Sequence, residues 1–479
     1  MFKKEVAIFI KKYPTEIMGI YFSIVFCSLA LVSLFIQPID NIVTIPLPLA
    51  ISVFTLLLSG LISIYLYANY SEIKGWRKFA ELFIMLAAIC ASLSDGFWIF
   101  LTVAAIIIIA GNIYEKTLAL DNTIIYGWLG MLGISIISSF FAVDSRVISF
   151  WATFGLVLYT SFFIAVYNQN FIQERGTEFV QRIGILLSFS IVSTVIFSLW
   201  HYNMSYYIDV LIFRFQASTG TDSLGMASIY GEWPTHSSAF LSLAFWVLIG
   251  IRSTYNLSKT RKIIINSGII FSFIGTLATL SRNAFLFLGI SIGMSLLILI
   301  IQKKQKRWFF LLLGIGSVFL GILYYLVTHF QKWRELFTNP LQQFTIASRI
   351  DQYQFGIEQI QQNDNFLIGI GLMNFGPLYQ RMMNDINLSD YLHQLFLSII
   401  LEIGYIGIII FLFLLYLIGR QIILNNRANN HNMIFLVVFF SWLATGIFDN
   451  WLYFIWSSTL FMILIALGSN NNNKSLKFK

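Results

Sequence analysis

About fourteen long apolar segments constrain what this chain can fold into more than any other feature of its sequence. A run of about 20 apolar residues is long enough to cross the hydrocarbon core of a bilayer as an α-helix. Because lipid offers no hydrogen-bond partners, only helices and closed barrels can span it, and unbroken apolar runs favour helices. The 479 residues are 58% hydrophobic and only 11% charged, too few charges for a soluble chain of this length. The sequence therefore predicts a polytopic membrane protein of the all-α class.

The predicted fold is a transmembrane helix bundle of about 12–14 spans that forms a single integral membrane domain over residues 1–479. Two longer polar segments, 202–235 and 328–392, interrupt the spans as loops, and we expect them to carry short helices. Residues 469–479, which include an asparagine run, form a tail. The approximate bounds of the expected spans are 15–37, 46–69, 78–93, 95–113, 123–142, 146–167, 179–201, 236–254, 261–279, 282–301, 306–327, 393–419, 432–448 and 450–468.

The basic residues set the expected orientation of the spans. The net charge is +8, and lysine and arginine gather in short clusters between apolar segments, at 71–79, 252–262 and 302–307. Such clusters mark the cytoplasmic side of a membrane protein. Both termini then lie in the cytoplasm, and the two polar loops lie on the outer face of the cytoplasmic (inner) membrane. The same clustering accounts for the positive charge without a nucleic-acid partner.

Cysteine, histidine and carboxylate residues show no pattern typical of a metal or cofactor site. Cys27 and Cys90 both fall in apolar runs, where we expect them to pack as small hydrophobic residues rather than to form a disulfide. The sequence has no glycine-rich nucleotide-binding loop and no His/Cys cluster at metal-ligand spacing. We therefore expect neither a metal ion nor an organic cofactor.

An ionisable ring opens one of the apolar runs. His393 and Gln394 stand at its predicted outer mouth, and Gly404 and Gly407 lie deeper in it. On a continuous helix both glycines fall within about 40° of the histidine, and Glu402 falls on the opposite face. Glycines let a second helix approach closely, so we expect Gly404 and Gly407 to be helix-packing residues that hold His393 toward the interior. The alternative interpretation is an interfacial histidine that binds water or lipid headgroups.

Three arginines join this histidine on the predicted outer face, where positive charge is not needed for orientation. Arg214 lies in the smaller polar loop, and Arg282 lies in a short turn between two spans. Arg349 begins a stretch of the larger loop whose apolar spacing predicts an amphipathic helix, on the membrane surface or on the bundle. The apolar residues of that stretch are Ile350, Tyr353, Ile357 and Ile360. Arginine forks match phosphate oxygens, so the three form a candidate clamp for a phosphorylated lipid headgroup. The alternative is that each contacts headgroups or forms a salt bridge in its loop.

Several segments resemble the O-antigen ligase family. "HQ", nine further residues and "GYIG", from His393 to Gly407, resemble its His-[Asn/Ser/Gln]-x9-Gly-x-x-Gly pattern. The stretch from Arg214 to Gly225 resembles the Arg-x10-Gly pattern of the related O-antigen polymerases. "NDNFLIGIGLMNFG", "TLSRNAFLFLGISIG" and "GIFDNWLYF" are similar to further family segments, so the resemblance covers roughly residues 120–468. "WPTHSS" departs from the family's more usual Pro-Asn, and His236 is therefore given no role.

The resemblance implies an enzyme that transfers or polymerises a glycan from an undecaprenyl-diphosphate donor on the outer face of the cytoplasmic membrane, without a metal ion. It makes His393 the catalytic residue that takes the proton of the acceptor hydroxyl. It also implies that three arginines bind the diphosphate and stabilise its developing charge: Arg214, Arg282 and Arg349. The acceptor is a glycan, a lipid or a protein, and the sequence leaves ligase and polymerase both open.

A membrane transporter of the inorganic-carbon (bicarbonate) type is the alternative from another class. Such proteins share this fold family, and "GPLYQ" and "GIFDNWLY" resemble their segments. A carrier is expected to have charged or broken helices near the middle of the membrane, around its substrate. Here the distinctive polar residues gather at the predicted outer edge, which favours the transferase.

Overall fold

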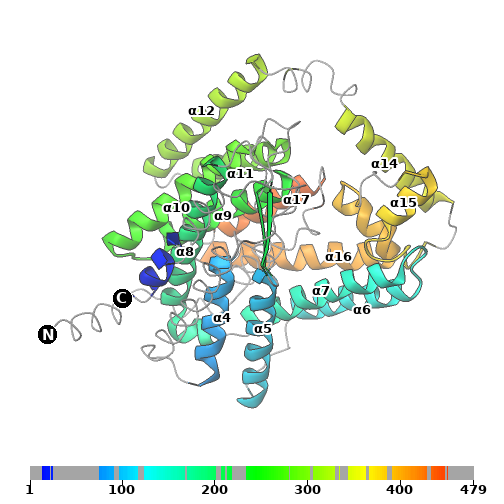
Figure 1. Ribbon diagram of the computed structural model, residues 1–479, viewed down its shortest axis with the longest axis horizontal. Coiled ribbons are helices and arrows are strands. Elements are labelled where there is room, and N and C mark those ends of the chain that lie inside the picture. The colour runs from blue at the N-terminus through cyan, green and yellow to red at the C-terminus, as the bar shows by residue number, and fades with distance from the viewer. Residues whose placement is uncertain are drawn as a thin grey trace. The chain divides into compact units, whose positions relative to one another are not determined.

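The computed structural model consists, in its described part, of helices and one small β-hairpin (Figure 1). The residues that the structure describes are 13, 15–21, 23–24, 75–90, 96–116, 123–167, 170–200, 206–210, 213–217, 234–279, 281–302, 306–329, 334, 344–362, 366–385, 391–428, 433–447 and 450. The helical fold class predicted from the sequence is confirmed. The predicted spans 15–37 and 450–468 lie largely outside the described residues, and the span 46–69 and the tail 469–479 lie entirely outside them.

Several of the described helices are apolar enough for a membrane. Four of them are also long enough to cross one, and they are Thr123–Phe140, Lys259–Ala278, Leu312–His329 and Leu395–Leu424. Shorter apolar helices occur at Thr102–Tyr114, Gln181–Ile196, Ser238–Ser253, Arg282–Leu297 and Phe435–Gly446. The chain is therefore a helical integral membrane protein, as the long apolar runs predict.

The chain divides into two compact units. Unit 1 comprises residues 1–119, 161–285 and 455–479, and unit 2 comprises residues 120–160 and 286–454. The single integral membrane domain over the whole chain stays a prediction, and each unit is described by itself.

Unit 1 is built around its longest helix. Its helices are α4 (Trp76–Cys90), α5 (Gly96–Tyr114), α8 (Asn170–Trp200), α9 (Pro234–Thr254) and α10 (Lys259–Ala278). Helix α8 contacts α4, α9 and α10, while α4 also contacts α5. Small residues make the packing close: a Cβ at Gly268 of α10 would lie 2.4 Å from the hydroxyl of Ser188 and 2.9 Å from Leu248. Such contacts are what holds helices together where lipid replaces water.

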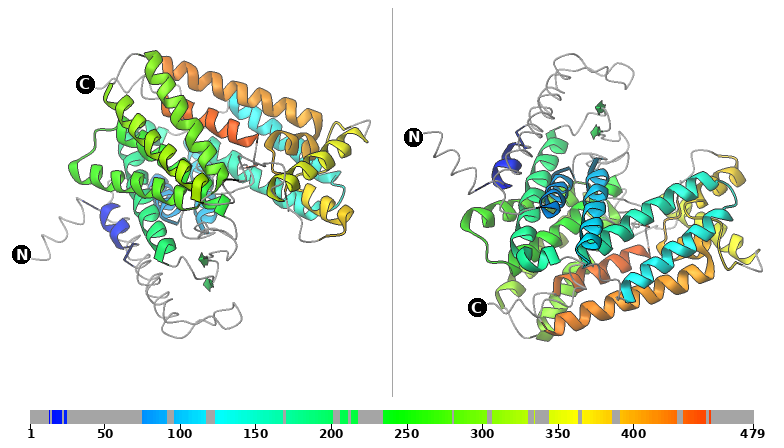
Figure 2. Two further views of the ribbon diagram at one scale, coloured as in Figure 1. Left: turned by 90° about the horizontal axis from the view of Figure 1, so that it is seen from above. Right: turned by 90° about the horizontal axis from the view of Figure 1, so that it is seen from below.

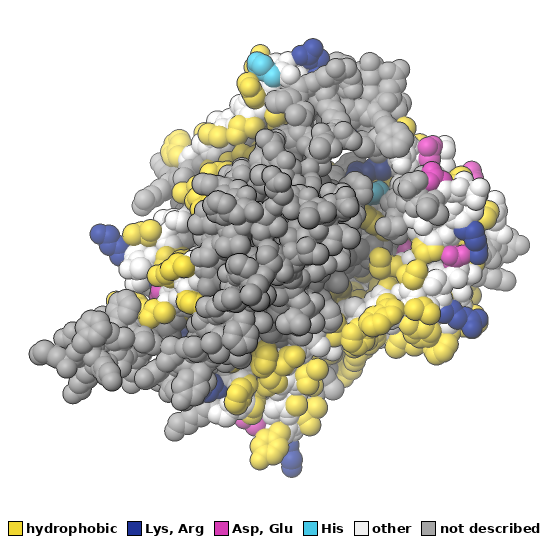
Figure 3. All heavy atoms as spheres, viewed as in Figure 1, with side chains coloured by type: hydrophobic (Ala, Val, Ile, Leu, Met, Phe, Trp, Pro, Cys, Tyr) yellow, Lys and Arg dark blue, Asp and Glu magenta, His cyan; other side chains and the backbone are white. Residues whose placement is uncertain are grey.

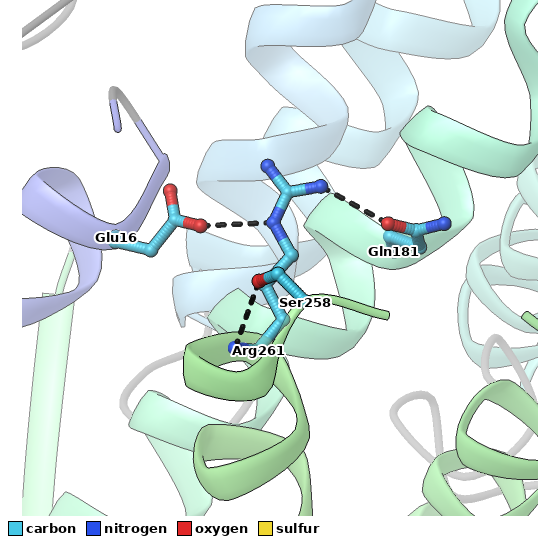
Figure 4. A network of polar contacts seen from close by, with 4 residues as sticks. All are labelled: Glu16, Gln181, Ser258 and Arg261. Atoms are coloured by element: carbon cyan, nitrogen blue, oxygen red, sulfur yellow. Dashed lines mark hydrogen bonds and ion pairs between the residues drawn. The ribbon is translucent and has the colours of Figure 1, made fainter. Parts of the chain in front are cut away.

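A polar network joins three helical segments of unit 1 at the predicted cytoplasmic end (Figure 4). The Arg261 guanidinium donates to Glu16 at 2.9 Å and to Gln181 at 3.0 Å. Ser258 caps the start of α10 by accepting the backbone N–H of Arg261. Because Glu16 is buried, the ion pair with Arg261 offsets the cost of removing that carboxylate from water. Arg261, one of the predicted orienting cations, therefore also holds helices together.

The smaller polar loop carries a β-hairpin in its described part, where the sequence predicts a short helix. Strand β1 (Tyr206–Val210) pairs antiparallel with β2 (Phe213–Ala217), and Asp209 faces Arg214 in the register. The reason is local: Phe213-Arg214-Phe215-Gln216 alternates apolar and polar residues, and the strands are rich in aromatic residues. Gly225 lies outside the described residues.

Unit 2 contains the remaining helices. They are α6 (Thr123–Phe140), α7 (Arg146–Tyr167), α11 (Arg282–Gln302), α12 (Lys306–His329), α14 (Phe344–Gln361), α15 (Phe375–Met383), α16 (Leu395–Ala428) and α17 (Met433–Gly446), of which α7 and α11 also have residues in unit 1. Helix α6 runs alongside α16 (Figure 2). A Cβ at Gly127 of α6 would lie 2.9 Å from Leu414 of α16, and one at Gly130 would lie 3.4 Å from Ile410. Glycines of α6 thus provide the close contact with α16.

The outward face of α6 and α7 is apolar. Hydrophobic side chains cover this surface in the space-filling view (Figure 3). They include Tyr126, Leu129, Ile136, Ile137, Phe140, Val147, Ile148, Phe150, Trp151 and Phe154. A soluble protein rarely exposes so continuous an apolar patch, whereas a lipid-facing surface requires one.

The helix predicted in the larger polar loop is confirmed as α14 (Phe344–Gln361), and only part of its predicted apolar face packs on the protein. Ile357 is 44% exposed, whereas Phe355 is buried. Helix α14 packs on α15 and α16 rather than lying free, and Phe355 stacks edge-on against Phe375. The neighbours, which spacing alone does not reveal, decide which face is covered.

Candidate functional site

The helix that follows His393 is broken. Helix α16 runs from Leu395 to Ala428, but Gly404 within it has φ 80° and ψ −174°, which is not helical. This combination is open almost exclusively to glycine. The prediction of one continuous helix through His393, Gly404 and Gly407 is therefore wrong, and the common face calculated from it does not exist.

Residues 366–371 of the larger loop dock their backbone into this break. Four backbone hydrogen bonds of 3.0–3.3 Å join the two segments: Ile370 N–H to Leu401 O, Gly371 N–H to Glu402 O, Tyr405 N–H to Phe366 O, and Ile406 N–H to Leu367 O. An interrupted helix leaves such groups without partners, and lipid cannot supply them. The loop satisfies them instead.

The two glycines predicted as helix-packing residues have different neighbours. A Cβ at Gly404 would lie 2.2 Å from the carbonyl oxygen of Leu367, so its partner is the loop backbone rather than a second helix. A Cβ at Gly407 would lie 2.6 Å from that of Ile403, in its own helix. Another segment thus approaches Gly404 closely, as predicted, but this segment is the loop backbone and not a second helix.

His393 lies in the turn before α16 rather than within the helix. Its ring packs on that of Tyr391, with centroids 4.5 Å apart and an angle of 53° between the planes. The next residue, Gln394, caps α16 by accepting the backbone N–H of Leu397. The hydroxyl of Ser398 donates to the carbonyl of Leu392 at 3.1 Å. Contacts of the residues before and after His393 thus fix the turn that carries the imidazole.

Helix α14 contacts the same turn. The Tyr353 hydroxyl donates to the backbone carbonyl of His393 at 2.7 Å. A Cβ at Gly356 would lie 3.6–3.7 Å from Leu392, Leu397 and Leu401, so this stripe of α14 faces the turn and the start of α16. Arg349 stands one helical turn before Tyr353 and two turns before Gly356, on the same stripe. Within unit 2 the structure therefore brings the Arg349 stripe of α14 to the His393 turn.

An apolar cluster supports these contacts. It joins α14, α15, the docked loop and the start of α16 through Phe355, Phe366, Ile370, Phe375, Leu378, Tyr379, Leu392 and Leu401. Burial raises the pKa of the Tyr379 phenol, and the negative charge of Asp351 raises that pKa further. Both effects favour the neutral phenol over the phenolate among these aromatic rings.

The turn between α6 and α7 makes polar contacts with Asn374 and Arg381 of the larger loop. The side-chain oxygen of Asn374 accepts the backbone N–H of Ser145 at 2.7 Å, and its amide donates to the carbonyl of the same residue at 3.1 Å. Arg381 pairs with Asp144 at 2.5 Å. The 143–145 turn and the larger loop therefore lie at the same end of these helices, as the predicted order of spans requires. That this end faces outward stays a prediction.

The other two predicted arginines belong to unit 1. Arg214 lies in β2, and Arg282 is the first residue of α11 and is half-buried. A clamp that combines these residues with Arg349 and His393 thus stays a prediction from the sequence. Among the described residues, no three His, Cys, Asp or Glu side chains are grouped as a metal ion would require.

Residues 267–412 match the family model described as O-antigen ligase. This segment is similar to the O-antigen ligase family. It includes Arg282, Arg349, His393 and the break at Gly404, and over these residues the resemblance indicated by the sequence motifs is confirmed. The match supports glycan ligase or polymerase function with a lipid-linked glycan and an acceptor as substrates. No curated protein matches the chain.

Sequence reasoning does not identify two residues of the matched segment as parts of the site. Apolar spacing makes Tyr353 only one position of an amphipathic helix, although its hydroxyl donates to the His393 turn. The geometry of a continuous helix turns Glu402 away from His393. The only sequence feature that could have pointed to it is a lone acidic residue inside a membrane span, which is costly there.

Removing the Tyr353 hydroxyl tests the link between α14 and the histidine turn. We expect Tyr353→Phe to lower glycan transfer about fivefold to tenfold while the protein stays folded, because one hydrogen bond contributes about 1 kcal/mol. Transfer is measured in cells as surface glycan per amount of membrane-inserted protein. Tyr325→Phe, in α12, is the matched control and should leave transfer unchanged. Equal transfer by both variants would contradict a role for the hydroxyl.

Proposed function

We propose that the protein transfers or polymerises a glycan from an undecaprenyl-diphosphate donor on the outer face of the cytoplasmic membrane. The observation that carries the proposal is the contact between the Arg349 stripe of α14 and the His393 turn, inside the segment that matches the O-antigen ligase family. A fork that suits phosphate and a ring that can take a proton lie on neighbouring elements there. The acceptor is a glycan, a lipid or a protein.

The proposed step is a substitution at the sugar carbon that carries the diphosphate. The acceptor hydroxyl oxygen forms a bond to this carbon while the bond from the carbon to the phosphate oxygen breaks. The proton of the hydroxyl passes to the imidazole of His393. The electron pair of the broken bond stays on the lipid diphosphate, whose growing charge is met by arginine. We assign this role to Arg349 together with Arg214 and Arg282.

The break in α16 bears on the alternative of a bicarbonate-type carrier. Carriers use broken helices to expose backbone groups to a substrate within the membrane. The backbone groups at this break are instead bonded to residues 366–371 of the same chain. This occupation favours the transferase, and the experiment below separates the two classes.

The arginine fork is tested by a charge-conserving change. We expect Arg349→Lys to lower transfer about tenfold to hundredfold, because an ammonium group keeps the charge but cannot present two parallel donors to a diphosphate. Arg334→Lys is the matched control: Arg334 lies in the same polar loop, is exposed, and donates to the carbonyl of Thr328.

The measurement is a gel of surface glycans together with the pool of undecaprenyl-linked glycan. The proposal expects that pool to accumulate with Arg349→Lys and not with Arg334→Lys. A carrier would instead show altered bicarbonate uptake with an unchanged pool.

A further inference from the structure

Glu402 is a buried acidic residue to which the proposed glycan transfer gives no role. It is the only acidic residue of α16 and is 0% exposed. Its position is about 10 Å along the helix from the start at Leu395, inside a helix long and apolar enough to cross a membrane. A carboxyl group at such a depth is costly unless it has partners, so its partners indicate its role.

The carboxyl group of Glu402 caps a helix other than its own. One oxygen accepts the backbone N–H of Met373 at 2.9 Å, and the other accepts that of Phe375 at 3.4 Å. The N–H of Phe375 is the first of α15, where a helix has donors without intrahelical partners, and Met373 lies two residues before it. Asn374 occupies the N-cap position but makes no capping bond, because its side chain is bonded to the 143–145 turn. Glu402 supplies the cap in its place.

The backbone carbonyl of Glu402 is also occupied. It accepts the N–H of Gly371 at 3.0 Å and the hydroxyl of Ser138 in α6 at 2.6 Å. The loop that meets it has positive φ at two residues, 100° at Gly371 and 56° at Met373, and the second is costly because Met373 is not a glycine. Such conformations persist only where surrounding contacts impose them. Glu402 provides contacts to both of these residues.

We propose that Glu402 is a positioning residue that locks segment 366–375 of the larger loop into the break of α16. The part of α16 before the break runs only from Leu395 to Ile403. A helix of about two turns has little stability of its own, so its direction depends on what it packs against. We call the contacts between Glu402 and segment 366–375 the lock. The lock therefore also sets the position of the turn that carries His393. The lock itself is independent of the proposed function, and only its effect on glycan transfer rests on it.

The test compares three replacements that differ in side-chain length and in accepting oxygens. Glu402→Gln keeps the length and one accepting oxygen, Glu402→Asp keeps both oxygens but is one methylene shorter, and Glu402→Ala removes both oxygens. The reporter is Ile370→Cys, a buried loop position that is 3% exposed, in a chain whose Cys27 and Cys90 are replaced by alanine. Maleimide labelling of the full-length protein in detergent then measures how often the loop leaves the break.

We expect the labelling rate to rise about tenfold or more in Glu402→Ala, to rise nearly as much in Glu402→Asp, and to rise least in Glu402→Gln. Glycan transfer should fall in the same order. A second reporter, Ile265→Cys in unit 1, is also buried and should stay unlabelled in all variants that fold. Should the alanine variant unfold and label at both sites, the glutamine and aspartate variants still decide.

Wild-type labelling rates in Glu402→Ala, or in both Glu402→Gln and Glu402→Asp, would overturn the proposal. Labelling needs no glycan substrate. If the labelling rates changed as expected but the protein transferred no glycan, the proposed function would be refuted and the positioning role of Glu402 supported. If the protein transferred glycan but labelling was unchanged in the Glu402 variants, the positioning role would be refuted and the proposed function supported.

Discussion

Replacing His393 by alanine is expected to stop glycan transfer in cells while leaving the protein inserted and abundant. A positioned general base contributes about 10²–10⁴-fold to a reaction rate, so the loss should far exceed that of a packing defect. The ring lies in the turn before α16 and packs on Tyr391, and the carbonyl of residue 393 still accepts the Tyr353 hydroxyl after the replacement. The fold of the turn should therefore survive.

The measurement is again the surface glycan gel with the undecaprenyl-linked pool, normalised to inserted protein. His329→Ala is the matched control, because His329 lies exposed at the end of α12 and stacks on Tyr325. We expect His393→Ala to accumulate the lipid-linked glycan and His329→Ala to behave as the wild type. An unchanged pool and unchanged surface polymer in His393→Ala cells with stable protein would refute the catalytic role.

Even the smallest side chain at Gly404 is expected to destabilise the protein strongly. Gly404→Ala forces a Cβ to within 2.2 Å of the Leu367 carbonyl oxygen. The backbone conformation alone costs a non-glycine residue about 1–3 kcal/mol, and the clash with the docked loop adds to it. We expect a clear fall in melting temperature in detergent and a lower yield of folded protein, with Gly404→Leu worse.

Gly133→Ala is the control for this change. Gly133 lies in α6, and a Cβ there would have nothing within 4 Å. Alanine suits a helix better than glycine by about 1 kcal/mol, so this variant should melt at or slightly above the wild-type temperature. If Gly404→Ala had the same melting temperature as Gly133→Ala, the break in α16 would not be the arrangement of the folded protein.

The sequence by itself determined the class of the protein and the place of its motif. Apolar runs long enough for a bilayer admit one kind of secondary structure, because lipid satisfies no backbone group, so helices and membrane insertion follow from composition and length. The residue types at His393 and Gly404, with nine residues between "HQ" and "GYIG", were enough to suggest the O-antigen ligase family that the match then supported.

Only the tertiary structure decided how these residues are held. The spacing of apolar residues predicts α14 as an amphipathic helix, but it does not tell which of these residues the neighbouring elements cover. A glycine in a membrane span is compatible with a straight helix and with a break. What selects the break at Gly404 is a backbone segment more than 30 residues earlier in the chain, whose hydrogen bonds replace those of the helix. Glu402 is held by the same long-range contacts, and no local pattern carries information about partners so distant in the sequence.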